Sequence, residues 1–308
     1  MSSVLSFPDR GPWGKSSYRG NCSGYVYREL FSQLRPSTFC DPMMGSGTSI
    51  EVAKEMGIEA HGLDLRLGFN ALRDSIRAAI GDKQVQLCIS HPPYGEMIRY
   101  SGSVWGTEPH PDDLSWCKDD EDFHAKLQCV LLNQRDATVG GGHYGTIIGD
   151  LRSKGRYVSY QAEAIARMPS DELVAVLIKQ QHNVVSDRRT YANMTLPRIQ
   201  HEYILLWRKR ERKVFELLKG LAVTSHDRLR NTWRSVVHMV LVQLGGTAAL
   251  KDIYAAVNAA APENCLANRH WQEKVRQVLN STPAWFSSPA RGVWSIAAPA
   301  PASLAAAA

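Results

Sequence analysis

Short β-rich apolar runs alternate with amphipathic, helix-like stretches along the first two thirds of this 308-residue chain. Such alternation is typical of βαβ units, in which parallel strands form one sheet and helices pack on its faces. The strand-like runs lie at residues 36–43, 58–65, 85–94 and 142–150, and the helix-like stretches lie at 49–57, 70–81, 120–139 and 157–168. The sequence therefore predicts an α/β domain built on a parallel sheet.

Two more apolar runs, LVAVLIKQQ at 173–181 and HEYILLWRK at 201–209, end this region. A polar, basic loop joins them, and no helix-like pattern lies between them. We therefore expect an antiparallel pair that closes the sheet at its edge, as is common in otherwise parallel sheets. The predicted catalytic domain spans residues 1–210.

The remaining sequence has a different character. A charged helical connector is expected at 211–227, and residues 228–297 show three helix-like stretches followed by two short aromatic-rich strands around an SSPARG turn. This pattern is typical of a winged helix, with residues 270–280 as its recognition helix if it reads DNA. The alternative is a module for protein contacts or dimerisation. The tail, 298–308, is low-complexity and is expected to be disordered.

Composition limits the location and the partners of the chain. Lys and Arg exceed Asp and Glu by 36 to 30, which gives a net charge of +6 and is compatible with a polyanionic partner. The chain lacks a long apolar run and its start does not resemble a signal peptide, so we expect a cytoplasmic protein without a membrane partner. The six cysteines show no regular spacing, which argues against a disulfide framework or a metal site.

A glycine turn, CDPMMGSGTSIEVA, follows the first apolar run and opens a helix. Gly45 and Gly47 let the backbone approach a ligand, Asp41 can receive an ammonium group or a water network, and Thr48 can cap the helix. Asp64 ends the next run, where a carboxylate can bind both hydroxyls of a ribose. These residues indicate a nucleoside cofactor, either NAD or S-adenosylmethionine. The turn is shorter than a dinucleotide fingerprint, and no hydride-transfer residues are evident, which favours S-adenosylmethionine.

Two motifs resemble those of the amino-directed DNA methyltransferases. DPMMGSGT is similar to their D-P-F-x-G-S-G-T cofactor motif, and HPPY is similar to their D/N/S-P-P-Y/F catalytic motif. WGKSSYRGNCSGYVYREL resembles their segment at the methionine end of the cofactor. Over residues 7–208, the resemblance implies a Rossmann-like, S-adenosylmethionine-dependent methyltransferase fold with a mixed seven-stranded sheet. The implied cofactor residues are Tyr18, Arg19, Gly20, Asn21, Ser23, Asp41, Pro42, Met43, Gly45, Gly47, Thr48 and Asp64.

The resemblance also implies a catalytic corner made of His91, Pro92, Pro93 and Tyr94. In such a corner the side chain of the first residue and the carbonyl of the second accept hydrogen bonds from an exocyclic amino group, while the aromatic ring stacks on a flipped base. His91 departs from the usual Asp, Asn or Ser, although a neutral imidazole can accept one hydrogen bond. In another interpretation His91 is a spacer and Ser90 approaches the base.

The expected partner is double-stranded DNA, and a homodimer is a further hypothesis. Tyr94 favours adenine N6 as the target, and the alternatives are cytosine N4, an RNA or protein amide substrate, and a DNA-binding module without catalysis. Loops of this family close over the flipped base, which suggests that role for 95–116. The residues expected to contact DNA are Arg99, Tyr100, Trp105, Arg188, Arg189, Tyr191 and Arg198.

Overall fold

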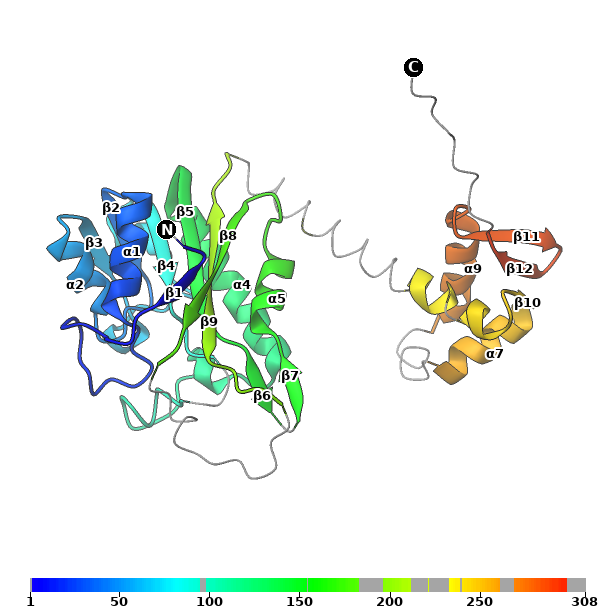
Figure 1. Cartoon of the computed structure of the whole chain (residues 1–308), viewed down its shortest axis with the longest axis horizontal. Helices are drawn as coiled ribbons and strands as arrows, with labels where there is room; N and C mark the ends of the chain where they lie inside the picture. The colour runs from blue at the N-terminus through cyan, green and yellow to red at the C-terminus, as the bar shows by residue number, and fades with distance from the viewer. Residues whose placement is uncertain are drawn as a thin grey trace, which may run out of the picture. The chain divides into compact units, whose positions relative to one another are not determined.

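The computed structural model describes residues 2–94, 98–153, 155–182, 196–211, 221, 233–238, 240–260 and 269–297. The chain divides into two compact units, Met1–Leu217 and Leu218–Ala308 (Figure 1). The helical connector expected at 211–227 lies almost entirely outside the described residues, and so does the tail at 298–308. Among the described helices, none combines the length and the apolar character that a membrane span requires.

The first unit is built on a seven-stranded sheet with the order β1-β8-β9-β5-β4-β2-β3. Strand β9 runs antiparallel to both of its neighbours, and the other paired strands are parallel. The strands are β1 (Val4–Ser6), β2 (Thr38–Asp41), β3 (Glu59–Gly62), β4 (Val85–Ser90), β5 (Thr138–Ile148), β8 (Leu173–Gln180) and β9 (His201–Arg208). The predicted Rossmann-like α/β fold with a mixed seven-stranded sheet is confirmed.

The antiparallel pair of β8 and β9 is also confirmed, but its predicted place at the edge of the sheet is wrong. Strand β9 lies between β5 and β8, and the short strand β1 pairs with β8 outside it. Val4 pairs with Ile178, and Leu5 is buried on the sheet. The sequence shows little sign of β1, because three residues are too few to reveal a strand periodicity.

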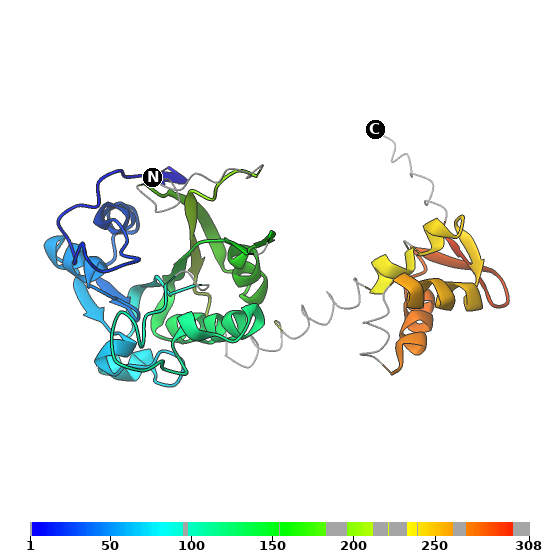
Figure 2. The same ribbon diagram turned by 90° about the horizontal axis from the view of Figure 1, so that it is seen from below.

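Helices cover both faces of the sheet. Helices α1 (Gly24–Leu34) and α2 (Thr48–Glu55) lie on one face, and α4 (Asp120–Asp136) and α5 (Tyr160–Arg167) lie on the other (Figure 1; Figure 2). Alternate residues of the strands point to opposite faces, so the core is split in two. One cluster joins α1 and α2 to residues such as Phe39 and Ile204, and the other joins α4 and α5 to Tyr144 and Trp207.

Two local predictions are corrected by side-chain hydrogen bonds. A helix was expected at 70–81, but α3 spans only Ile76–Ala79. Asp74 accepts a hydrogen bond from the Asn70 N–H, and Asn70 accepts one from the Leu72 N–H, so polar side chains hold the chain in a turn instead. Thr48 does not cap α2, because the N-cap is Gly47 and the Thr48 hydroxyl donates to Asn21.

Smaller elements complete the first unit. Strands β6 (Leu151–Ser153) and β7 (Arg156–Val158) form an antiparallel hairpin directly before α5. Two short 3-10 helices, Leu65–Leu67 and Leu114–Trp116, begin after the capping carboxylates Asp64 and Asp113.

The second unit contains helices and a small antiparallel sheet. Residues 233–238 and 240–243 are helical, and α7 (Leu250–Ala260) and α9 (Trp271–Ser281) follow. The sheet has the order β10-β12-β11, with strands β10 (Thr247–Ala249), β11 (Phe286–Ala290) and β12 (Val293–Ile296). Thr247–Ala249 pairs with β12, so α7 begins only at Leu250. The winged-helix assignment stays a prediction.

Candidate functional site

The side chains singled out in the sequence meet at one edge of the sheet. Asp41 is the last residue of β2, Asp64 follows β3, and His91 follows β4. Strand β2 pairs with both β3 and β4 in parallel, so the carboxyl ends of the three strands lie side by side. Ligands of open α/β sheets bind at this edge. The fold thus brings these groups together as the sequence predicted.

A pocket occupies this edge, and it encloses about 830 Å³ of space when its open mouth is included. The predicted residues that line it are Tyr18, Gly20, Asn21, Asp41, Pro42, Met43, Gly45, Thr48, Asp64, His91, Pro93, Tyr100 and Trp105. The glycine turn and the first residue of the His-Pro-Pro-Tyr corner therefore share one pocket.

The glycine turn is held by Asp64. One carboxylate oxygen of Asp64 accepts the Gly45 N–H at 2.9 Å, and the other accepts the Arg66 N–H at 2.9 Å. Gly45 has a φ of 53°, and a β-carbon added there would lie 3.1 Å from the ring of Tyr18. The turn therefore requires glycine at this position both for its left-handed backbone and for the close approach of Tyr18.

Asp41 is buried at the base of the pocket. Its carboxylate accepts hydrogen bonds from the Ser49 hydroxyl at 2.6 Å and from the Met43 N–H at 3.0 Å. Burial outweighs these two bonds and raises the pKa of Asp41 to about 7. The charge of this carboxyl therefore responds to what occupies the pocket near neutral pH.

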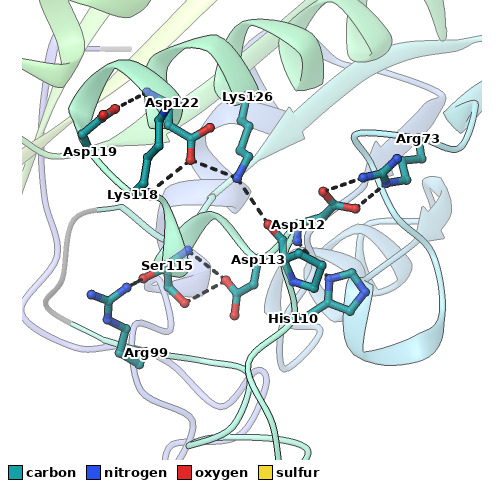
Figure 3. Close-up of polar contacts among 11 residues, drawn as sticks. Arg73, Arg99, His110, Asp112, Asp113, Ser115, Lys118, Asp119, Asp122 and Lys126 are labelled. Carbon is teal, nitrogen blue, oxygen red and sulfur yellow. Dashed lines mark hydrogen bonds and ion pairs between the residues drawn. The ribbon is translucent and has the colours of Figure 1, made fainter.

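The segment 98–116 forms a wall of the pocket, and Asp113 organises it. The Asp113 carboxylate accepts four hydrogen bonds, two from Ser101 and two from Ser115, over 2.6 to 2.9 Å. Figure 3 shows Asp113 facing Ser115 beneath the 3-10 helix. The Tyr100 hydroxyl donates to the Arg19 carbonyl at 3.1 Å, which ties this wall to the segment that was expected to hold the methionine end of a cofactor.

A second clamp fixes the same wall to the residues after β3. Asp112 accepts hydrogen bonds from the Arg73 guanidinium and from the Asn70 amide, as Figure 3 shows for Arg73. This region supplies lining residues that the sequence analysis missed, namely Phe69, Asn70, Ala71, Leu72, Asp112, Asp113 and Leu114. Asn and Asp residues within 70–81, a stretch that we expected to be helical, were the sequence signal for these lining residues.

The His-Pro-Pro-Tyr corner presents two of its four residues to the pocket. His91 and Pro93 line it, whereas Pro92 is buried and Tyr94 is not on the wall. Ser90 is fully buried and its hydroxyl donates to Gln134 on α4, so the interpretation in which Ser90 approaches a ligand is not supported.

Tyr94 packs toward the core. Its ring lies 6.3 Å from that of Tyr160, and its hydroxyl donates to the carboxylate of Glu202 on β9 at 2.6 Å. A β-carbon at Gly149 would lie 2.5 Å from this hydroxyl, so the glycine leaves the space that the phenol fills. Glu202 also contacts His91 and Lys179, and neither Glu202 nor Lys179 was singled out in the sequence.

The remaining predicted site residues lie away from the pocket wall. Arg99 stacks on Trp116, with its guanidinium carbon 4.4 Å from the ring centre, and donates to the Ser115 carbonyl. The Ser23 hydroxyl donates to the Asp9 carbonyl. Arg19 and Gly47 do not line the pocket, Arg198 is exposed, and Arg188, Arg189 and Tyr191 lie outside the described residues.

Comparison with known proteins gives similarity in fold only. No protein-family model matches the chain, and no curated protein matches it. Similar solved structures include TrmN from Thermus thermophilus, with 14% identity, a TM-score of 0.40 and coverage of 62% of this chain and 50% of that one. They also include TTHA0409 from the same organism, provisionally named a DNA modification methylase and complexed with S-adenosyl-L-methionine, with 21% identity, a TM-score of 0.30 and coverage of 47% and 54%.

A third is the 16S rRNA N2 G1207 methyltransferase RsmC from Thermus thermophilus, in complex with AdoMet and guanosine, with 14% identity, a TM-score of 0.33 and coverage of 64% and 45%. The chain thus matches about half the length of each of these proteins. All three TM-scores lie below 0.5, so the similarities do not decide what this chain acts on. The order and direction of its own strands define the Rossmann-like α/β fold with a mixed seven-stranded sheet.

Proposed function

We propose that this protein transfers a methyl group from S-adenosylmethionine to an exocyclic amino group of a flipped base in double-stranded DNA, with adenine N6 as the first target. The observation that supports this most directly is the shared pocket of Gly45, Asp64 and His91. A cofactor turn and an amino-binding corner on one cavity are what a direct transfer between two bound molecules requires.

The lining of the pocket offers polar groups that suit the cofactor. Asp64 keeps lone pairs free beyond its two backbone contacts, and these can accept the ribose hydroxyls. The Ser46 hydroxyl is buried and has no hydrogen-bond partner among the described residues, which leaves a polar group for a ligand to satisfy. Asp41 can balance the positive charge of the ligand. S-adenosylmethionine would supply an electrophilic methyl group on its sulfonium sulfur.

The corner provides acceptors for the amino group. An exocyclic amine is a poor nucleophile, because its lone pair is delocalised into the ring of the base. His91 and the carbonyl of Pro92 would accept hydrogen bonds from its two N–H groups, which favours a tetrahedral nitrogen. Its lone pair could then form the bond to the methyl carbon as the bond from that carbon to sulfur breaks, and one amino proton would leave to solvent. Pro93 stiffens the turn and keeps these acceptors in place. Alignment of the two reacting groups then supplies most of the rate enhancement.

A single assay tests the activity and the substrate class together. The full chain is incubated with radiolabelled S-adenosylmethionine and, separately, with genomic DNA, tRNA and protein. We expect label in DNA, and we expect Asp64→Ala to abolish it by loss of cofactor binding. Expression in a methylation-free host, followed by mapping of modified bases, then identifies the target atom and its sequence context.

The other outcomes are equally informative. Label in tRNA or in protein would replace DNA as the substrate, and modified cytosine would replace adenine. Calorimetry that detects cofactor binding without label in any substrate would contradict catalysis and would leave a cofactor-dependent binding protein.

A further inference from the structure

A buried ion pair lies directly behind the His-Pro-Pro-Tyr corner. Lys179 on β8 and Glu202 on β9 are cross-strand partners, and the Lys179 ammonium donates to one carboxylate oxygen of Glu202. Their side chains are only 12% and 4% exposed. Both residues interrupt strands that are otherwise mostly apolar.

The carboxylate of Glu202 collects three donors. Lys179 occupies one oxygen, and the other oxygen receives the Tyr94 hydroxyl at 2.6 Å and lies 3.3 Å from Nε2 of His91. Burial alone would raise the pKa of Glu202, but attraction to Lys179 and the contact with His91 outweigh it, so that this pKa lies well below its ordinary value. Glu202 is therefore an ionised carboxylate, which can only accept hydrogen bonds.

An acceptor-only partner decides which nitrogen of His91 bears the proton. Nε2 must present an N–H to the carboxylate, since two acceptors facing each other would repel. In the neutral imidazole the other nitrogen, Nδ1, is then unprotonated. Among the described residues, none forms a hydrogen bond with Nδ1, and His91 lies on the wall of the pocket.

We propose that Glu202 is a positioning residue that holds His91 as the Nε2–H tautomer, and that Nδ1 of His91 is thereby the atom that accepts a hydrogen bond from the amino group of the substrate. The inference rests on the function proposed above and assigns the acceptor atom within it. It also explains how histidine can replace the usual Asp, Asn or Ser at this position: a carboxylate behind the ring fixes which nitrogen is the acceptor. Lys179 keeps that carboxylate ionised within the sheet.

The first test reads the tautomer without any methyl transfer. Long-range ¹H–¹⁵N spectra of the full chain labelled with ¹⁵N-histidine distinguish the two neutral tautomers, and the signal missing from His91→Asn identifies His91 among the ten histidines. We expect the Nε2–H pattern in the wild type. In the double variant Lys179→Met with Glu202→Gln, which removes both charges together and leaves no lone buried ion, we expect a mixture of the two tautomers.

The second test is kinetic. In the double variant, kcat for DNA methylation should fall at least tenfold, while the KM for S-adenosylmethionine changes less than threefold, because neither substituted residue lines the pocket. The matched control is another buried ion pair, Arg135 with Glu172, at the amino end of β8. Arg135→Met with Glu172→Gln should alter thermal stability and leave the His91 tautomer as in the wild type.

The outcomes separate this inference from the function on which it rests. An Nδ1–H pattern in the wild type, or an unchanged tautomer in the Lys179 and Glu202 double variant, would overturn the role of Glu202 even if DNA is methylated. A wild-type protein that shows the Nε2–H pattern but labels no DNA would overturn the proposed substrate instead, and with it the assignment of Nδ1 as the substrate acceptor.

Discussion

The protonation state of one buried residue, Asp41, should affect how tightly the pocket binds a cationic ligand. Asp41 has a pKa near 7 because burial disfavours its charged form. A cation bound beside it favours the ionised form, so binding should release a proton below that pH and should weaken as the pH falls from about 8 to about 6.

We expect this pH dependence to be measurable as cofactor affinity. Calorimetry on the wild type should show the dissociation constant of S-adenosylmethionine rising about tenfold over that range, the change expected when a single protonation competes with binding. Asp41→Asn removes the titrating group and should bind weakly at every pH with a flat profile. An equally steep profile in the variant would mean that another group is responsible.

The two glycines of the turn allow backbone strain to be separated from ligand contact. Both have positive φ, so alanine costs each about 1 kcal/mol. At Gly45 the new methyl group would also press on Tyr18, whereas at Gly47 it would meet nothing within 4 Å. We predict a somewhat larger loss of thermal stability for Gly45→Ala than for Gly47→Ala, and a loss of cofactor affinity of about tenfold for Gly45→Ala alone. Equal affinities would argue against a ligand role for the turn.

At the scale of elements, the wall formed by 98–116 depends on one carboxylate. The Asp113 carboxylate accepts four hydrogen bonds. In Asp113→Asn an NH₂ group, itself a donor, would face two of these four donors. Hydrogen bonds to a charged group contribute about 1.5–3 kcal/mol. Asp113→Asn should therefore loosen the wall, with faster proteolysis within 98–116 and cofactor affinity reduced at least tenfold.

Asp119→Asn is the matched control, because Asp119 makes a single capping bond at the start of α4 and does not line the pocket. It should leave both readouts near the wild-type values. If Asp113→Asn behaves like this control, the wall holds its shape without the carboxylate.

Local sequence patterns explain which strands and helices could be predicted. The strands β4, β8 and β9 are dense in apolar residues, so their approximate positions follow from local composition. The order β8-β9-β5 does not, because it depends on which edges pair in space. Likewise α3 is short because the side chains of Asn70 and Asp74 accept hydrogen bonds from nearby backbone N–H groups in place of helical bonds. These local bonds do not alter the amphipathic pattern from which a longer helix was predicted.

The candidate site was predictable where one local motif contained it. Asp41, Gly45 and Asp64 lie close in sequence at strand ends, and spacing places them together. Lys179 and Glu202 lie more than eighty residues after His91 and come close to it only because strands pair in space. The spacing of residues along the sequence does not show such pairing. A charged residue inside an apolar strand is a signal of such a partner, since an unpaired buried charge is costly.

Each of the two units has its own hydrophobic core, and the sheet divides that of the first unit. Val275, Val278 and Leu279 of α9 face the core of the second unit, which leaves Arg276 and Gln277 exposed on the same helix. We propose that this exposed face contacts DNA while the first unit binds the cofactor. Because the two units have separate cores, changes on α9 should leave the pocket intact.

The last prediction tests this division of roles in the full chain. Arg276→Ala with Gln277→Ala should weaken binding to the mapped target duplex about tenfold or more, since each direct contact contributes about 1–3 kcal/mol. Affinity for S-adenosylmethionine should stay within twofold of the wild type. Lys251→Ala, which removes an exposed cation from α7, is the control for a purely electrostatic effect. Equal weakening by both changes would indicate attraction to charge alone, and no weakening by either would place DNA recognition outside α9.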